Sequence, residues 1–273
     1  MHTDTLSFNY KRIAEGYAQD RPFLHKHVMD LLKAKLNLKQ NFKNGLDVGC
    51  GAGLSSKALR LVCDHVTGTD ISAEMVQAAA ALYTDESFTF LQCKAEELDE
   101  TLGSFDIVTA AGVINWVDET IFLPALEKMM EPDGILLIYD FGITDEMEGN
   151  ANFTDWYREQ YLAMFPKPPR KENVWTEADV SPYHFHIMAQ DNYKTGFPMD
   201  KEQFIRFMLL QSNVIAQVEE KGKTLTDVKK WFENTLTPYF EDNKKENLIF
   251  AGYNWYLQKQ SITKGAFSWT DKT

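Results

Sequence analysis

The residues best suited to bind a charged ligand lie in one short stretch, Asp47–Gly53. Leu46 and Val48 are typical of a buried strand, and the three glycines after them allow a tight turn and a close approach of the backbone to a ligand. A helix that begins near Leu54 would direct its N-terminus at that ligand. The stretch therefore predicts a nucleoside-binding loop between a strand and a helix.

The spacing of these glycines narrows the choice of ligand. Gly49-x-Gly51-x-Gly53 differs from the dinucleotide pattern G-x-G-x-x-G, and no Gly-Lys-Ser/Thr follows it as in a Walker loop. Asp47, two residues before the first glycine, would repel a pyrophosphate but attract an ammonium or a sulfonium group. S-adenosylmethionine carries both of these cations and no phosphate, so it suits this loop best.

A second carboxylate, Asp70, lies 23 residues after Asp47 at the end of the next predicted strand. Ligands of open α/β sheets bind outside the carboxyl ends of the strands, where Asp70 could accept hydrogen bonds from both ribose hydroxyls. Ile71 and Met75 would then form an apolar wall for adenine. Asp70 or Ser72 could instead cap the next helix, and the two apolar residues could belong to the core.

Three further segments could complete such a site. Ala95 and Glu96, after the third predicted strand, could contact the edge of adenine through a backbone N–H and a carboxylate. Ala111, at the end of the fourth, would let a methionine tail pass. Tyr17 and Arg21, in an N-terminal helical segment, could close over the ligand or simply pack on the sheet.

Strands and helices alternate through the first half of the chain, after a helical preface from residue 6 to about residue 38. Such alternation indicates right-handed crossovers and a parallel sheet covered on both faces. The predicted strands are 44–48, 65–70, 88–93, 105–111 and 134–141, and the predicted helices between them are 54–63, 73–83 and 118–130.

The composition changes after Gly142, because residues 151–273 hold 22 of the 35 aromatic residues. We expect helices at 152–163, 200–218 and 224–236 and a late strand at 248–253. These rings would form a second small core and an apolar acceptor cavity. The predicted units are an N-terminal helical cap (1–40), a cofactor-binding core (41–142), a lid (143–245), a returning strand of the core sheet (246–260) and a tail (261–273).

The overall charge is acidic, with 40 Asp and Glu against 28 Lys and Arg and a net charge of −12. Such a field repels nucleic acids and anionic membranes. No apolar run approaches the ~20 residues of a membrane span, and the first residues lack the features of a signal peptide. Cys50, Cys63 and Cys93 have no metal-type spacing and suit buried thiols. We expect a cytoplasmic protein without a nucleic-acid or membrane partner.

In this order and spacing, the motif Asp47-x-Gly49-x-Gly51-x-Gly53, Asp70, the Ala95-Glu96 pair and the fourth-strand segment resemble the class I S-adenosylmethionine-dependent methyltransferases. The preface from Tyr10 to Pro22 and the segment 115–118 are similar to the quinone-biosynthesis and trans-aconitate types. The resemblance implies an α/β fold with a Rossmann-like, doubly wound sheet of seven strands. S-adenosylmethionine would be the cofactor and S-adenosylhomocysteine the product.

The resemblance also implies roles at the matching positions: the three glycines approach the methionine moiety and the ribose, Asp47 anchors the amino-acid end, Asp70 holds the ribose, and Ala95 with Glu96 flanks adenine. Two residues depart from the pattern. Many relatives have an acidic residue where Lys94 stands, and trans-aconitate types often have a histidine where Asn115 stands. A shifted acceptor pocket would fit both departures.

No catalytic base can be assigned from the sequence. Tyr183, His184 and His186 are candidates, since alternation along a strand would place the two histidines on one face. Two histidines alone do not make a metal site, and an ordinary structural placement explains them equally well. The resulting hypothesis is methyl transfer to a small-molecule acceptor. The alternatives are a non-catalytic binder of the same cofactor, transfer of another group, and a nicotinamide oxidoreductase.

Overall fold

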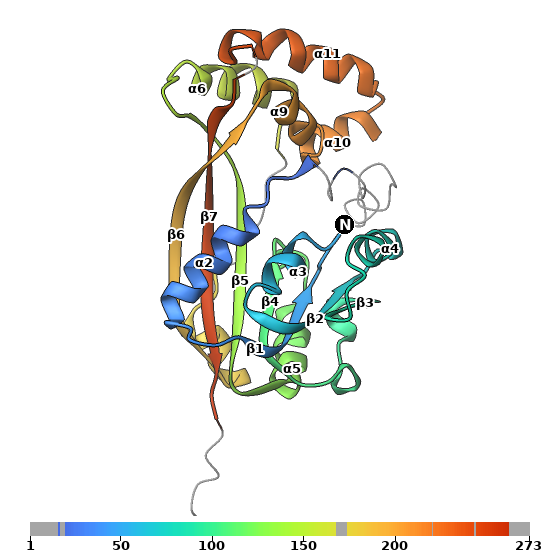
Figure 1. Cartoon of the computed structure of the whole chain (residues 1–273), viewed down its shortest axis with the longest axis vertical. Helices are drawn as coiled ribbons and strands as arrows, with labels where there is room; N and C mark the ends of the chain where they lie inside the picture. Colours follow the sequence, from blue (N-terminus) through green and yellow to red (C-terminus); the bar gives the residue numbers. More distant parts are fainter. Residues whose placement is uncertain (1–15, 17–19, 168–173, 220, 243, 262–273) are drawn as a thin grey trace, which may run out of the picture.

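A computed structural model describes residue 16 and residues 20–167, 174–219, 221–242 and 244–261 (Figure 1). Tyr17 of the predicted site lies outside these residues. The strands are β1 (Phe42–Val48), β2 (Cys63–Asp70), β3 (Phe88–Gln92), β4 (Phe105–Ala111), β5 (Met130–Met147), β6 (Phe185–Met199) and β7 (Glu246–Lys259). The α-helices are α2 (His25–Leu36), α3 (Leu54–Leu59), α4 (Ala73–Leu82), α5 (Glu119–Met129), α6 (Phe153–Asp155), α7 (Leu162–Met164), α8 (Glu177–Val180), α9 (Lys201–Met208), α10 (Ser212–Glu219) and α11 (Leu225–Leu236).

Short helical turns complete the list: η2 (Ala95–Glu97), η3 (Glu100–Leu102), η5 (Ser181–Tyr183) and η6 (Thr237–Tyr239) are 3-10 turns, and η4 (Trp156–Tyr161) is a π-helical segment between α6 and α7. None of the helices in the part of the chain that the structure describes is both long and apolar enough to cross a membrane.

All seven strands form one sheet in the order β3-β2-β1-β4-β5-β7-β6. The first five run parallel, whereas β7 is antiparallel to both of its neighbours, β5 and β6. The carboxyl ends of β1, β2 and β4 therefore meet at one edge, with the order reversing between β1 and β4. This architecture confirms the predicted fold class.

Two apolar layers cover the sheet. On one face, α2 and α3 pack through Val28, Leu32 and Leu59 against Leu137 and Tyr139 of β5. On the other face, α5 packs through Phe122 and Leu126 against Val108 and Leu136. Residues 135–139 of β5 are buried on both sides, as a central strand should be.

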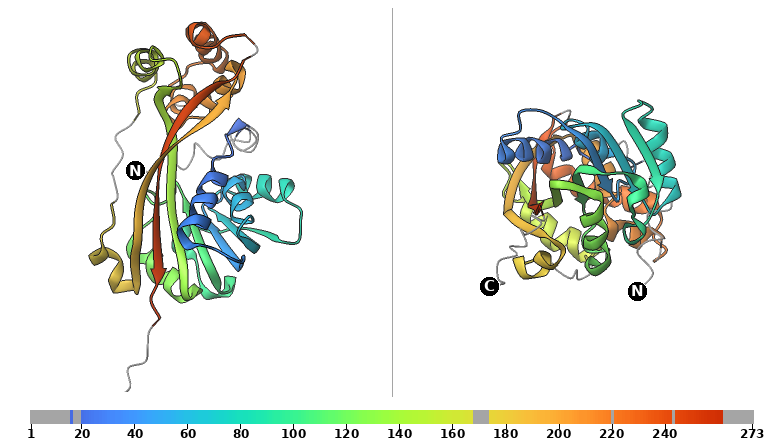
Figure 2. Two further views of the ribbon diagram at one scale, coloured as in Figure 1. Left: turned by 60° about the vertical axis from the view of Figure 1, so that its left-hand side comes forward. Right: turned by 90° about the horizontal axis from the view of Figure 1, so that it is seen from below.

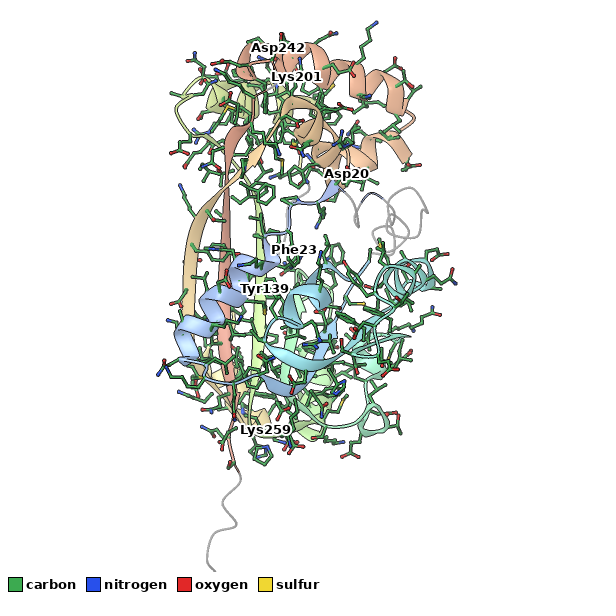
Figure 3. All side chains as sticks on the ribbon, viewed as in Figure 1. Asp20, Phe23, Tyr139, Lys201, Asp242 and Lys259 are labelled. Atoms are coloured by element: carbon green, nitrogen blue, oxygen red, sulfur yellow. The ribbon has the colours of Figure 1, made fainter. Side chains whose placement is uncertain are left out.

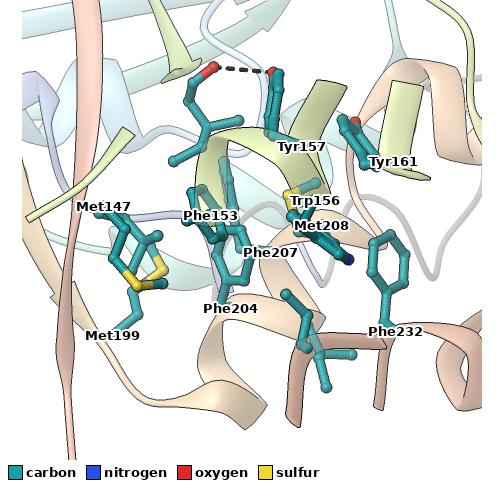
Figure 4. Close-up of a cluster of buried hydrophobic side chains, with 14 of the residues drawn as sticks. Met147, Phe153, Trp156, Tyr157, Tyr161, Met199, Phe204, Phe207, Met208 and Phe232 are labelled. Carbon is teal, nitrogen blue, oxygen red and sulfur yellow. Dashed lines mark hydrogen bonds between the residues drawn. The ribbon is translucent and has the colours of Figure 1, made fainter. Parts of the chain in front are cut away.

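The strands β5, β6 and β7 are much longer than the others and continue past the sheet into a helical cap (Figures 1 and 2). The cap contains α6, η4, α7, α9, α10 and α11. It encloses its own aromatic core, in which Phe153, Trp156, Phe204 and Phe232 are fully buried (Figure 4). The cap lies beyond the carboxyl edge of the sheet, so any ligand on that edge faces it.

Three predicted elements differ from the structure. The helix expected at 54–63 ends at Leu59, because β2 already begins at Cys63. The helix expected at 200–218 is divided into α9 and α10. The range 143–245, predicted as a lid, also contains β6, an edge strand of the sheet. Exposed and half-buried residues alternate along β6, because this edge strand covers the core with one face only. The strand therefore contains many polar residues and is difficult to recognise in the sequence.

Candidate functional site

Asp70, at the carboxyl end of β2, is tied to the glycine loop that follows β1. Its Oδ2 accepts the backbone N–H of Gly51 at 2.9 Å, and its Oδ1 accepts the N–H of Ser72 at 2.9 Å. Burial raises the pKa of this carboxyl group, although the two backbone N–H groups act in the opposite direction. The structure therefore brings together two of the predicted site residues, Asp70 and the middle glycine.

Asp47 has a different role from the predicted one. The residue has no exposed surface, and its carboxylate accepts hydrogen bonds from the hydroxyls of Ser55 at 2.6 Å, Ser56 at 2.7 Å and Thr109 at 2.8 Å. Burial raises its pKa to about 6, despite these three donors. Asp47 thus holds the start of α3 and the end of β4 in place beneath the loop. This internal role replaces the predicted contact with the ligand.

The three glycines of the motif all have positive φ, at 67° for Gly49, 53° for Gly51 and 89° for Gly53. A Cβ at Gly49 would meet Val113 at 2.3 Å, and one at Gly53 would meet Tyr83 at 2.6 Å. A Cβ at Gly51 would have no protein atom within 4 Å. The outer two glycines therefore permit packing, while the middle one borders open space.

Ile71 and Met75, the two residues predicted to form a wall for adenine, differ in their exposure to solvent. Ile71 is 47% exposed, whereas Met75 is buried in α4. Ser72 caps α4, because its hydroxyl accepts the N–H of Met75 at 3.3 Å. Ile71 is thus available to a ligand, and Met75 supports the helix beneath it.

The segment after β3 lies beside Asp70, since the N–H of Cys93 donates to the carbonyl of Asp70 at 3.0 Å. Ala95 and Glu96 are partly exposed in the turn η2. A carboxylate oxygen of Glu96 accepts the N–H of Asp118 at 3.1 Å and so joins this turn to the start of α5. Lys94 points to a surface ion pair with Glu97 at 2.8 Å.

The end of β4 meets β5, a contact that sequence reasoning missed. Ala111 pairs with Tyr139, and the N–H of Gly112 donates to the carbonyl of Tyr139 at 2.8 Å. Asp140 follows on β5, with its Oδ1 3.4 Å from the position that a Cβ on Gly112 would occupy. Nothing in the local pattern of β5 singled out Asp140, because its position depends on the strand register.

Asp20 and its neighbours connect the preface to the cap (Figure 3). A guanidinium nitrogen of Arg206 on α9 lies 2.8 Å from the carboxylate of Asp20. Beside this ion pair is a cavity of about 160 Å³. Its lining residues are Asp20, Arg21, Pro22 and Phe23 of the preface, Phe197 and Met199 of β6, and Gln203 and Arg206 of α9.

The preface is also anchored to the sheet. His25 Nδ1 lies 2.9 Å from the hydroxyl of Tyr139, and the two rings meet edge to face. Burial, with a smaller contribution from the charge of Arg21, lowers the pKa of His25 to about 3. The neutral imidazole therefore fixes the start of α2 against the middle of β5.

The candidate bases Tyr183, His184 and His186 lie at the wrong edge of the sheet. His186 pairs with Gln258, which in turn pairs with Ile135 near the start of β5. This is the amino edge, opposite the glycine loop. Among the residues that the structure describes, no group of three or more His, Cys, Asp or Glu side chains could hold a metal ion.

Known proteins share this arrangement. Residues 46–138 match the family described as "Methyltransferase domain". Over this range the chain is similar to a methyltransferase domain. The matched range contains the end of β1, all of β2 to β4, the glycine loop and the first part of β5, so it includes most of the predicted cofactor-binding residues. The predicted resemblance is confirmed.

Relatives differ in how much of the chain they match. A ubiquinone biosynthesis O-methyltransferase of Xanthomonas oryzae pv. oryzae is 31% identical over 130 residues, 46% of this chain and 53% of that protein. A candidate methyltransferase of Dictyostelium discoideum is 21% identical over 249 residues, 90% of this chain and 91% of the relative. The chain spans about half the length of most of the other curated relatives it matches.

Among solved structures, a candidate type II methyltransferase from Anaeromyxobacter dehalogenans has a fold similar to that of this chain. The TM-score is 0.63 at 17% sequence identity, with 86% of this chain and 95% of that chain covered. At this identity the likeness establishes the fold alone.

Proposed function

We propose that the protein transfers a methyl group from S-adenosylmethionine to a small-molecule acceptor. The observation that carries this proposal is the hydrogen bond from the Gly51 N–H to Asp70, which places a carboxylate beside an open glycine loop at the β1–β4 reversal. The methyltransferase domain over residues 46–138 supports it.

The carboxylate of Asp70 fits a ribose. Each of its two oxygens accepts one backbone N–H, and an ionised carboxylate offers about four acceptor positions. Two positions thus remain for a pair of vicinal hydroxyls. The open space at Gly51 lets the backbone approach the same ligand without a side chain between them.

The residues after β2 and β3 and at the end of β4 would orient the ligand along the edge of the sheet. Exposed Ile71, with Ala95 and Glu96, provides an adenine site on the β2–β3 side. The amino-acid end would then extend the other way, past Ala111. Arg21 also remains a predicted contact, from the preface side.

The bound cofactor would supply an electrophilic methyl group on a sulfonium, so the protein mainly has to position the acceptor and exclude water. The cap lies beyond the carboxyl edge of the sheet (Figure 2). We expect it to close over a small acceptor there. The net charge of −12 disfavours nucleic acid as an acceptor. The acidic surface thus supports a small-molecule substrate, as the sequence predicts.

Calorimetric titration with S-adenosylhomocysteine tests the cofactor site. Asp70→Asn should weaken binding by roughly 10- to 100-fold, because hydrogen bonds to a charged group contribute about 1.5 to 3 kcal/mol. Asp64→Asn changes the same residue type at the other end of β2 and should leave binding unchanged. Equal affinity in all three proteins, or no binding to wild type, would refute the site. A parallel titration with NADH should give no signal, whereas binding of NADH would favour the oxidoreductase alternative.

Transfer of a labelled methyl group from S-adenosylmethionine distinguishes the enzyme from a non-catalytic binder. Wild type and Asp70→Asn should be incubated with labelled S-adenosylmethionine and a metabolite extract, and transfer of label to extract compounds should be followed. We expect transfer with wild type only. Tight binding without transfer to any fraction would favour a regulatory role.

A further inference from the structure

The preface meets the cap beside the cavity of about 160 Å³. Asp20 is ion-paired with Arg206 of α9, which lies 186 residues away in the sequence. A Cβ built on Gly16 would lie 2.7 Å from Cδ2 of Leu210, just after α9. Figure 3 shows Asp20 between the cap and the sheet. The cavity therefore lies where two segments that are distant in sequence pack together.

The lining of this cavity has a charged part and an apolar part. Its ionisable groups are one carboxylate, Asp20, and two guanidinium groups, Arg21 and Arg206. Positive charge is thus in excess, although the whole chain has a net charge of −12. A ligand that fits this lining would combine an anionic group with a small apolar body. The apolar part of the lining consists of Pro22, Phe23, Phe197 and Met199.

Arg206 keeps N–H groups for a ligand. Its Nε lies 2.8 Å from Oδ1 of Asp20, and its Nη1 lies 3.1 Å from Oε1 of Glu202. Within the described residues, nothing accepts a hydrogen bond from its Nη2. A guanidinium has five N–H donors in a planar fork, which matches the two oxygens of a carboxylate. Glu202 is 73% exposed and does not line the cavity, so solvent screens its charge.

Gln203 adds a second donor on the same helix. Its Oε1 accepts the N–H of Asp200 at 3.2 Å, while the carboxylate of Asp200 accepts the N–H of Gln203 at 2.8 Å. This capping box fixes the side-chain amide at the start of α9. The amide nitrogen has no acceptor in the part of the chain that the structure describes. Residues three apart share one face of a helix, so Gln203 and Arg206 present their donors side by side.

We propose that this cavity binds a small organic carboxylate, held by Arg206 and Gln203 with its apolar body against Phe23 and Phe197. Arg21 adds positive charge from the preface side. The buried part of the ligand would have about six non-hydrogen atoms, since an engineered cavity of about 150 Å³ holds benzene. The ligand would bridge the preface and the cap. This site is separate from the proposed cofactor site and does not depend on the proposed function.

Titrations followed through the NMR signals of the ligand test the charge preference. Butyrate, butyramide and butylammonium have nearly the same size and differ in charge, and each is added to the full chain at constant ionic strength. Wild type should bind butyrate about 10-fold more tightly than butyramide, because a charged acceptor strengthens each hydrogen bond, and it should not bind butylammonium. Equal binding of butyrate and butyramide, or no binding of butyrate, overturns the proposal. Tighter binding of inorganic phosphate than of butyrate would overturn the choice of an organic ligand.

Substitutions on the two sides of the ion pair should act in opposite directions. Arg206→Gln should weaken butyrate binding at least about 10-fold, whereas Asp20→Asn removes a competing carboxylate and should strengthen it. If the ion pair only joins the preface to the cap, both substitutions loosen the same contact and shift butyrate binding in the same direction. That result would overturn the proposal. Lys229→Gln removes an ion-paired cation of α11 that does not line the cavity, and it should behave as wild type.

Gln203→Glu tests the second donor without disturbing the start of α9. Glutamate is an ordinary residue at this position of a capping box, so the helix and the midpoint of thermal unfolding should be retained. The new carboxylate replaces the amide donor and repels an anion, so butyrate binding should be lost. Butyrate binding as in wild type would overturn the assignment of this side of the cavity.

Saturation with S-adenosylhomocysteine distinguishes a separate acid from the carboxylate of the cofactor itself. The affinity for butyrate should not change, because the proposed nucleoside contacts lie at β2 and β3. Displacement of butyrate by S-adenosylhomocysteine would show that the cavity belongs to the cofactor site, and it would overturn the proposal. A chain that binds butyrate as described but not S-adenosylhomocysteine would retain this site and refute the proposed function.

Discussion

The carboxylate of Asp70 and the backbone N–H of Gly51 are joined by a hydrogen bond of 2.9 Å across two neighbouring strands. The bond makes the glycine loop and the end of β2 a single unit. Any change in the conformation of the loop therefore moves the proposed ribose acceptor as well. The loop is held by contacts of Gly49 and Gly53 with their neighbours, whereas a Cβ on Gly51 would have no atom within 4 Å.

The glycines of the motif should differ in what they contribute. In Gly53→Ala the new Cβ would be strained by the φ of 89° and would crowd Tyr83 and Ala79. This substitution should lower the free energy of unfolding by about 2 to 4 kcal/mol. Gly51→Ala meets no atom and should lose only about 1 kcal/mol to backbone strain. Gly51→Ala should nevertheless bind S-adenosylhomocysteine at least about 10-fold more weakly, because its Cβ enters the ligand's space. Urea unfolding and calorimetry measure both effects, and equal effects of the two substitutions on stability would contradict this account.

Asp47 should make stability fall as the pH rises. Its pKa of about 6 in the folded protein exceeds the ordinary 3.8, so its contribution to stability is complete below the lower value and is lost as the pH passes through the higher one. Asp47→Asn removes this titration. Between about pH 5 and about pH 8, wild type should lose on the order of 1 to 2 kcal/mol of unfolding free energy relative to the variant. Urea unfolding at both pH values measures this difference, and a constant difference would show that Asp47 does not titrate there.

Much of this site follows from local sequence. The glycine spacing requires backbone conformations that the structure confirms, and Asp70 lies at a strand end that the apolar pattern marks. The role of Asp47 could not be predicted, because two of its hydroxyl donors come from α3 and the third, Thr109, from a strand 62 residues away. Local pattern shows that a carboxylate is present but not how deeply its neighbours bury it.

The position of Asp140 cannot be predicted for a related reason. Asp140 acquires its position from the pairing of Ala111 with Tyr139 and from the φ of Gly112, neither of which is visible in β5 itself. The alternation around His186 predicts a strand. Its strand, β6, exists, but the direction of that strand in the sheet places His186 at the amino edge. Register and strand direction are properties of the whole fold.

His25 should make the protein sensitive to acid. Its pKa of about 3 lies below the ordinary 6.5, so its contribution is complete above the higher value and declines as the pH falls toward the lower one. Between about pH 8 and about pH 5, wild type should lose about 2 kcal/mol of unfolding free energy relative to His25→Gln. His65→Gln alters an exposed histidine and should change nothing. If His25→Gln and wild type lose stability in parallel, the imidazole is not buried as described.

The aromatic core of the cap should be separable from cofactor binding. Phe232 is fully buried against Phe165 and Trp231, and none of the proposed cofactor residues belongs to its cluster. Phe232→Ala should lower the free energy of unfolding by about 3 to 5 kcal/mol, as large cavities do. Affinity for S-adenosylhomocysteine, measured below the unfolding transition, should stay within about threefold of wild type, since the nucleoside contacts lie on the sheet.

Phe122→Ala is the matched comparison, because Phe122 is equally buried but belongs to the cluster beneath β1 and β4. It should weaken cofactor binding as well as stability, since the same cluster contains Val48 and Ala110, which border the loop. A loss of affinity in Phe232→Ala as large as in Asp70→Asn would mean that the cap holds the cofactor directly. The cap would then belong to the cofactor site, and its closure would be required before any acceptor could bind.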